Sequence, residues 1–107
     1  MNSRRDENDE SALDGLYFEW HKLKAAANLK KHKVSFEEAK TIFGDERLLV
    51  IPDREHNEEE ERYLAFGRSD RGRVLTLCFT ERRERIRIIS ARLAERWERR
   101  EYESAND

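Results

Sequence analysis

The sequence has too few cysteines for a disulfide-stabilised protein. Cys78 is the one cysteine among 107 residues, so no disulfide can form within the chain. No charged and then apolar leader opens the sequence, and secretion is therefore not expected. These two features favour a reducing compartment, and we expect a cytoplasmic protein.

Long apolar runs are also missing. The longest, residues 48–52 and 74–79, fall far short of the roughly 20 residues that cross a bilayer, so no membrane contact is expected. Apolar residues make up 36% of the chain and charged residues 43%, so a few concentrated segments must supply the core. A chain of this length has room for one such core and hence one domain.

The net charge is small, but the charges are unevenly placed. The whole chain carries −2, whereas residues 68–100 hold eleven arginines against five acids. Acids gather instead in residues 1–14 and 53–61. The basic half is compatible with binding to a nucleic acid in spite of the net charge.

The chain divides into two tails and a folded segment. Residues 1–14 are almost free of apolar side chains and are predicted to form a disordered acidic tail, as are the last residues, 104–107. The domain is expected over 15–103. It should begin with a short aromatic strand over 16–20 and a helix over 22–32. The stripe expected along that helix is Leu23, Ala26, Ala27 and Lys30.

The second helix is signalled by a capping box. Ser35 and Glu38 have the spacing that closes a helix N-terminus, with Val34 placed to pack on Ala39. This helix is predicted to reach Phe43 and to end where Gly44 takes a left-handed conformation.

Strand patterns dominate the rest of the chain. They are predicted over 48–52, 62–68, 73–80 and 85–90, with a last helix over 92–102. The run over 73–80 is apolar on both alternations, so it should be central and covered on both faces. The predicted fold class is α+β, with an antiparallel sheet of about four to five strands packed with two N-terminal helices and one C-terminal helix.

Short motifs in a characteristic order run through residues 16–103. They are FEW at 18–20, Lys24, NLKKH at 28–32, VSFEEA at 34–39, ERYLAFGRS at 61–69, RIRIISAR at 85–92 and ER at 98–99. Together they resemble the BrnT family of bacterial toxins. The resemblance implies a RelE-like fold, metal-independent RNA cleavage and inhibition of translation. It also implies a ribbon-helix-helix antitoxin, joined in a hetero-oligomer, through which alone the toxin would reach operator DNA.

Two positions depart from the family pattern. His21 stands where Asp is usual, and the loss of that helix cap should cost about 1 kcal/mol. Lys33 stands where Gly is usual, and a left-handed lysine costs on the order of 1 kcal/mol. They leave open a catalytically inactive module that acts with the antitoxin in operator binding. A domain that binds RNA without cutting it is a third possibility.

Arginines are the residue type that metal-independent RNA cleavage needs most. The 2′-hydroxyl attacks the adjacent phosphorus, and a permanently charged guanidinium fork can hold two phosphate oxygens. Arg68 ends one predicted strand and Arg92 begins the predicted last helix, and both lie in matched motifs. We expect the two to converge at one edge of the sheet as catalytic residues. The alternative for each is an ordinary solvated arginine.

Other candidates come from the same motifs. His32 can exchange protons near neutral pH and is a predicted general acid or base, although a helix C-terminus also favours a histidine without any catalytic role. Lys24 is a predicted catalytic residue that orients phosphate. The predicted RNA-binding residues are Lys31, Arg85, Arg87 and Ser90. A solvated basic face, or a cap in the case of Ser90, is the alternative.

No metal or cofactor is predicted. The three histidines lack the spacing of metal ligands. Cys78 lies in an apolar run and is expected to be a packing residue rather than a nucleophile. The acids at 58–61 should remain in solvent.

Overall fold

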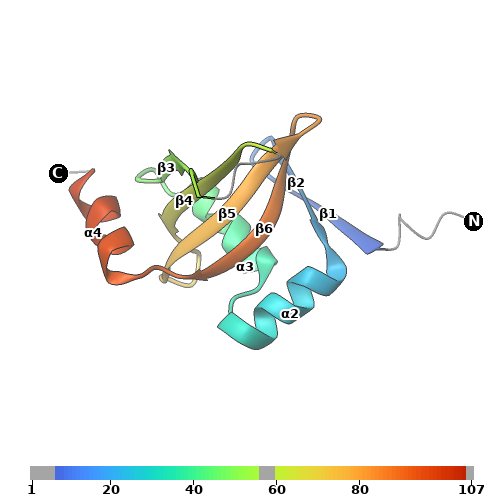
Figure 1. The fold of residues 1–107 in the computed structure, drawn as a ribbon, viewed down its shortest axis with the longest axis horizontal. Helices are drawn as coiled ribbons and strands as arrows, with labels where there is room; N and C mark the ends of the chain where they lie inside the picture. Colours follow the sequence, from blue (N-terminus) through green and yellow to red (C-terminus); the bar gives the residue numbers. More distant parts are fainter. Residues whose placement is uncertain (1–6, 56–59, 106–107) are drawn as a thin grey trace, which may run out of the picture.

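The computed structural model describes residues 7–55 and 60–105, and in these residues six strands form one mixed sheet (Figure 1). The elements in chain order are β1 (Asn8–Leu13), β2 (Leu16–His21), α2 (Lys22–His32), α3 (Phe36–Lys40), the 3₁₀ helix η1 (Thr41–Gly44), β3 (Leu49–Pro52), β4 (Arg62–Arg68), β5 (Val74–Arg82), β6 (Arg85–Leu93) and α4 (Arg96–Ser104). The strand order is β1-β2-β6-β5-β4-β3. Strands β2 and β6 run parallel, and the other neighbours run antiparallel.

The α+β class and its three α-helices among the described residues are confirmed, but the predicted antiparallel sheet of four to five strands is wrong. The sheet is mixed because the chain returns from β5 with β6 lying parallel to β2. It also gains β1, which lies inside the segment predicted to be a disordered tail. Residues 1–6 of that predicted tail lie outside the described residues.

A tight hairpin explains β1. Leu13 pairs with Leu16, and the two residues between them, Asp14 and Gly15, have φ angles of 46° and 85°. Two positive φ angles are the requirement of a type I′ turn, for which Asp-Gly is a favoured sequence. Strand β1 is held at the edge of the sheet by main-chain pairing with β2 and needs few apolar side chains. The apolar pattern of the sequence therefore did not predict it.

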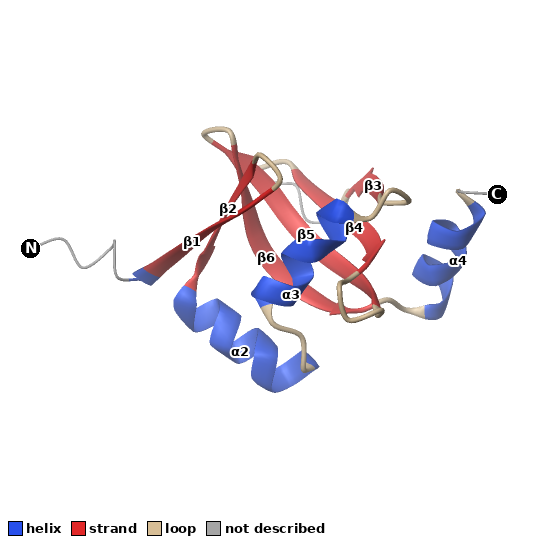
Figure 2. Ribbon diagram, turned by 180° about the vertical axis from the view of Figure 1, so that it is seen from behind, coloured by secondary structure: helices blue, strands red, loops and turns tan. Residues whose placement is uncertain are grey.

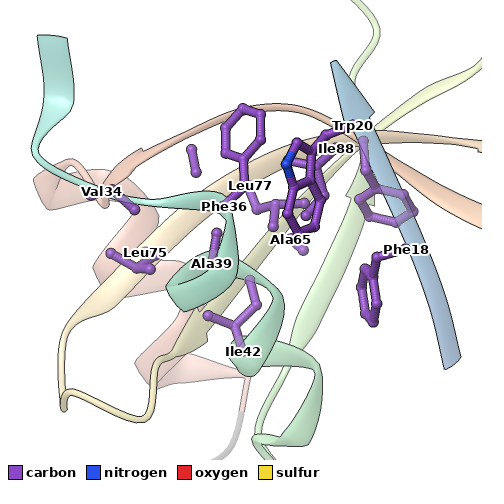
Figure 3. Packing of buried hydrophobic residues seen from close by; sticks show 12 residues of the cluster. Phe18, Trp20, Val34, Phe36, Ala39, Ile42, Ala65, Leu75, Leu77 and Ile88 are labelled. Carbon is purple, nitrogen blue, oxygen red and sulfur yellow. The ribbon is translucent and has the colours of Figure 1, made fainter. Parts of the chain in front are cut away.

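The main core lies between the sheet and α3 with η1 (Figures 2 and 3). Its buried side chains include Phe18, Trp20, Val34, Phe36, Ala39, Ile42, Ala65, Leu75, Leu77 and Ile88. The predicted capping box begins α3, since the Ser35 Oγ accepts a hydrogen bond of 3.0 Å from the Glu38 amide. The predicted left-handed Gly44 is wrong: the helix tightens into η1, and Asp45 continues in extended conformation.

Helix α2 has the predicted bounds. His21 and Lys33, the two residues that depart from the family pattern, are both accommodated at its ends. The His21 Nδ1 accepts a hydrogen bond of 3.1 Å from the Leu23 amide, so the expected loss of the N-cap is wrong. Lys33 takes the expected left-handed conformation, with φ of 60°. The reason to suspect a degraded copy is therefore weaker than it looked from the sequence.

The orientation of α2 is opposite to the one its apolar stripe suggests. Asn28 is buried against the edge of β6, where its side chain donates 2.8 Å to the Ala91 carbonyl and accepts 3.1 Å from the Ala91 amide. It also donates 3.0 Å to the Val34 carbonyl. Because β2 pairs with β6 only near Ile86 and Arg87, this amide takes the place of a strand partner further along β6.

The second face of the sheet is partly covered by α4. Phe66, Val74 and Tyr102 form a smaller core there, and Trp97 meets Phe66 edge-on at 5.9 Å. As predicted, β5 is buried through residues 74–80. The last helix begins at Arg96 rather than at residue 92, because β6 extends to Leu93 and a capping box closes on Glu95. No helix in the described parts of the chain is long and apolar enough to cross a membrane.

Candidate active site

A cationic pocket of 280 Å³ opens where β4 and β6 end, where β5 begins and where α4 crosses the sheet. Its lining residues are Arg68, Gly72, Arg73, Val74, Leu93, Arg99 and Glu103. Three separate elements each contribute a guanidinium, and Glu103 contributes a carboxylate. Such a group of fixed cations suits an anionic ligand, a phosphate above all.

Arg68 is positioned in this pocket by its backbone and by neutral oxygens. Its amide donates 2.8 Å to the Asp45 Oδ2, which also accepts 2.6 Å from the Tyr102 hydroxyl. Its guanidinium donates 3.0 Å to the Gly72 carbonyl. Burial alone would raise the pKa of Asp45, but the hydrogen bonds from Tyr102 and Arg68 outweigh it and lower that pKa. In the described residues no salt bridge occupies the Arg68 guanidinium.

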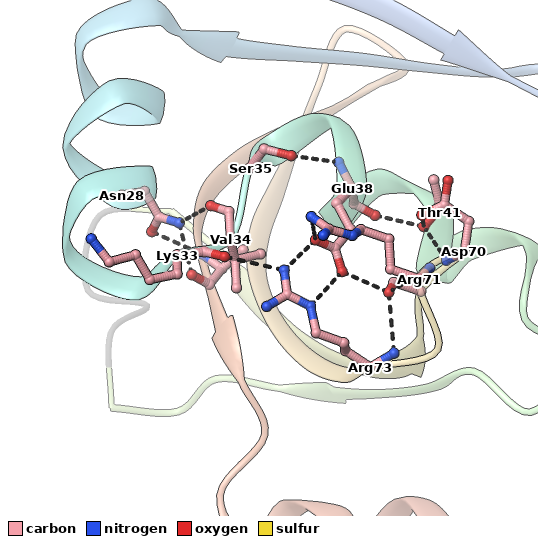
Figure 4. Close-up of polar contacts among 11 residues, drawn as sticks. Asn28, Lys33, Val34, Ser35, Glu38, Thr41, Asp70, Arg71 and Arg73 are labelled. Carbon is pink, nitrogen blue, oxygen red and sulfur yellow. Dashed lines mark hydrogen bonds and ion pairs between the residues drawn. The ribbon is translucent and has the colours of Figure 1, made fainter.

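Arg73 forms the rigid wall of the pocket (Figure 4). Its Nε donates 2.9 Å to the Glu38 Oε2, its Nη2 binds the Glu38 Oε1, and the same Nη2 donates 3.1 Å to the Lys33 carbonyl. Ser69 donates a further 2.7 Å bond to Glu38. The hydrogen bond from Arg73 lowers the pKa of the buried Glu38, against the effect of burial. Arg73 therefore holds α3 to the β4–β5 turn.

Arg99, like Arg68, is exposed, whereas Arg73 is half-buried. Arg99 lies on the exposed side of α4, one turn before Glu103. Among the residues that the structure describes, no side-chain hydrogen bond or salt bridge engages its guanidinium. Among the described residues, Arg68 and Arg99 are thus the two pocket arginines whose guanidinium groups form no salt bridge.

Arg92 lies on the same sheet face as Arg68 but is held away from the pocket. Arg68 is opposite Val74 and Arg92 is opposite Thr76, on the two sides of β5; strand spacings put their Cα atoms roughly 12 Å apart. The Arg92 guanidinium binds Glu98 in bidentate fashion, at 2.6 Å and 2.9 Å. Arg68 and Arg92 therefore share one face of the sheet but do not converge as predicted. Of these two residues, only Arg68 lines the pocket.

Glu98 is the anchor of this ion pair. It is fully buried and also accepts 2.9 Å from the Thr76 hydroxyl and 2.8 Å from the Glu95 amide. Burial by itself raises the pKa of Glu98, but the bonds from Arg92, Glu95 and Thr76 lower it overall. The pair ties the first turn of α4 to β5 and β6.

The predicted residues on α2 lie outside the pocket lining. His32 is half-buried at the C-terminal end of the helix, beside Lys33, whose carbonyl binds the pocket residue Arg73. Lys24 and Lys31 are exposed. Their roles in catalysis and RNA binding stay predictions.

The remaining predicted RNA-binding residues line up along β6. Arg85 binds Glu10 of β1, and Arg87 binds Glu19 of β2. Ser90 is exposed between them and Arg92. All four side chains lie on the face that carries Arg68, because a bulge between Cys78 and Phe79 restores the alternation. The face is basic, but Glu10 of β1 and Glu19 of β2 form salt bridges with the arginines at the end of the face that lies away from Arg68.

Sequence reasoning missed Arg73, Arg99 and Glu103. The signal for Arg99 was present, since it belongs to the motif at 98–99, but only the fold shows which way it points. Cys78 is a packing residue as expected: burial, and then the nearby Asp53, raise the pKa of its thiol to about 11. The described part of the chain contains no group of three His, Cys, Asp or Glu side chains arranged to hold a metal ion.

A family-model match over most of the chain places this small α+β protein among the ribonuclease toxins. Its structure is similar to the 1.1 Å crystal structure of the Brucella abortus ribonuclease toxin BrnT, with a TM-score of 0.56 and 20% identity over 72% of this chain and 94% of that chain. Residues 20–98 match the family model described as the ribonuclease toxin BrnT of a type II toxin-antitoxin system. The chain belongs to the BrnT family. Comparison with curated proteins gave no match.

The family match covers only part of the described structure. It begins at Trp20 and ends at Glu98. Strand β1 and the pocket residues Arg99 and Glu103 therefore lie beyond it. As a type II toxin, the protein has a cognate antitoxin.

Proposed function

We propose that this toxin cleaves RNA at the pocket by a metal-independent attack of a ribose 2′-hydroxyl on the adjacent phosphorus. The observation that carries the proposal is that Arg68 and Arg99 line one pocket with guanidinium groups that form no salt bridge among the described residues. Arginine forks aimed at a phosphate stabilise the negative charge that grows in the transition state. Arg73, fixed by Glu38, gives the pocket a rigid cationic wall.

The bond changes in this step balance without a cofactor. The 2′-oxygen bonds to phosphorus, the bond to the 5′-oxygen breaks, and the products carry a 2′,3′-cyclic phosphate and a 5′-hydroxyl. One group must accept the proton of the 2′-hydroxyl and another must supply a proton to the leaving oxygen. Glu103 is the carboxylate inside the pocket. His32 is the proposed second group, at the end of α2 next to the Lys33 carbonyl that binds Arg73.

The other basic residues have supporting parts in the proposal. Lys24 and Lys31 on α2, and Ser90, Arg87 and Arg85 along β6, would contact phosphates on either side of the cleaved bond. Arg92 acts as a positioning residue, since its bond to Glu98 fixes the helix that carries Arg99. Cleavage of RNA by the free toxin inhibits translation in this proposal. A ribbon-helix-helix antitoxin neutralises the toxin, and the complex reaches operator DNA through that antitoxin.

The mechanism predicts that cleavage depends on the 2′-hydroxyl and not on a divalent cation. The purified full chain should cut a labelled RNA at an unchanged rate in excess EDTA. A single 2′-deoxy nucleotide at the cleaved position should abolish that cut, because the nucleophile is gone. A deoxy substitution one nucleotide away is the matched control and should leave the cut in place.

Two results would contradict the mechanism. Loss of cleavage in EDTA that returns with Mg²⁺ would make a metal part of the reaction. Cleavage at the 2′-deoxy position would show that water, and not the ribose, is the nucleophile.

A further inference from the structure

Helix α2 turns its apolar stripe toward solvent. Its inward residues are Ala25, Asn28 and His32, which are spaced by about one helical turn and are buried or half-buried. The opposite stripe is Leu23, Ala26, Ala27 and Lys30, all exposed. An ordinary amphipathic surface helix has the reverse arrangement.

The exposure of the leucines on this helix is large. Leu23 is 73% exposed and Leu29 is 48% exposed. The alanines between them leave the backbone of α2 open to close approach by another segment. Since Asn28 fixes the inward face through two hydrogen bonds to Ala91 of β6 and one to the Val34 carbonyl, the helix cannot rotate to hide the stripe without breaking them.

The charge around the stripe has one sign. Residues 22–33 contain the lysines 22, 24, 30, 31 and 33 and no acid. Lys22 has a distant salt bridge to Asp9, at 3.8 Å, and Lys33 donates to the Lys30 carbonyl. The surface is therefore an apolar strip with a cationic border, and a complementary partner needs an apolar strip with an acidic border.

We propose that the outer face of α2, formed by Leu23, Ala26, Ala27 and Lys30, is the docking surface for an acidic amphipathic segment of the antitoxin. A polypeptide partner exists because the chain belongs to a toxin-antitoxin family. The apolar side chains of a polypeptide gain from contact with the apolar strip itself, whereas the phosphates of an RNA backbone would interact with its cationic border alone. The inference rests on that partnership and not on the proposed cleavage mechanism.

The test uses two exposed positions and one matched control. Leu23→Glu and Ala27→Glu place a carboxylate in the strip, while Val50→Glu does the same at the opposite edge of the sheet, where Val50 is 42% exposed on β3. Titration calorimetry measures binding of each full-length toxin to the antitoxin encoded beside its gene. Thermal unfolding of each free variant verifies that it is folded.

Each α2 variant should raise the dissociation constant by about tenfold or more, because an apolar contact is lost and like charges meet. Val50→Glu should stay within about twofold and cleave RNA at the unaltered rate, while the two α2 variants should lose less affinity for RNA than for the antitoxin. Antitoxin affinity unchanged in both α2 variants overturns the proposal. So does RNA binding by Leu23→Glu that weakens, without antitoxin, as much as antitoxin binding does, since that result would make the strip an RNA surface. Failure of the cleavage mechanism would leave the antitoxin titrations as expected.

Discussion

Arg68→Ala is expected to lower the rate of RNA cleavage by about 10²–10³-fold, the cost of removing one preorganised donor from a developing oxyanion. Arg68 ends β4 inside the pocket, and its guanidinium is positioned by the Gly72 carbonyl. No other pocket arginine enters from β4, so the loss has no substitute. The measurement is the initial rate of cutting of a labelled RNA in EDTA.

The substitution should leave the fold intact, because Arg68 is exposed and the bond to Asp45 comes from its backbone amide. The free energy of unfolding should change by less than about 0.5 kcal/mol. Arg96→Ala, at the exposed start of α4, is the control and should keep full activity. If Arg68→Ala cuts RNA as fast as the control does, Arg68 has no part in the reaction.

Glu98→Ala is expected to lower the free energy of unfolding by about 3 kcal/mol, within the range for breaking one side of a buried ion pair. The substitution removes the carboxylate that accepts from Arg92, from the Thr76 hydroxyl and from the Glu95 amide. All three donors lose a partner, and of these the Thr76 hydroxyl is buried while the Arg92 guanidinium and the Glu95 amide are part-buried. Urea denaturation of the two proteins at neutral pH measures the difference.

Glu101→Ala is the matched control, since Glu101 is exposed on the same helix. It should change stability by less than about 0.5 kcal/mol. Because the folded pKa of Glu98 is lowered, its contribution is complete above the unfolded pKa, near 4.5, and is lost as the pH falls through the folded value. Glu98→Gln should therefore reduce the acid sensitivity of the protein. Equal stabilities of Glu98→Ala and Glu101→Ala would show that the ion pair does not anchor α4.

Local signals in the sequence were enough for most of the elements. The bounds of α2 were predicted from its residue pattern, and the Ser35 capping box begins α3. What failed depends on contacts distant in sequence. Whether the basic-bordered stripe on α2 faces in or out was decided by Asn28 pairing with Ala91, 63 residues away. The pairing of β2 with β6 likewise has no local signature.

The lining of the pocket was predicted only in part, because it too depends on contacts between residues that are distant in sequence. Arg68 could be chosen because it closes a strand within a family-like motif, and it lines the pocket. Arg92 could be chosen in the same way, but its occupation by the buried Glu98 depends on where α4 folds back onto the sheet. Arg99 and Arg100 are adjacent arginines on one helix; the motif at 98–99 includes Arg99 and not Arg100, but only the fold shows that Arg99 faces the pocket.

These two neighbours provide the most direct test of the central claim, that guanidinium groups in the pocket between β4 and α4 hold the phosphate that is cut. Arg99 lines the pocket, whereas Arg100 is exposed elsewhere on α4. The measurement is the rate of RNA cleavage in EDTA by Arg99→Ala and Arg100→Ala. We predict a loss of at least about tenfold for Arg99→Ala and less than about twofold for Arg100→Ala. Equal rates for the two variants, or a greater loss for Arg100→Ala, would contradict the assignment of the active site to this pocket.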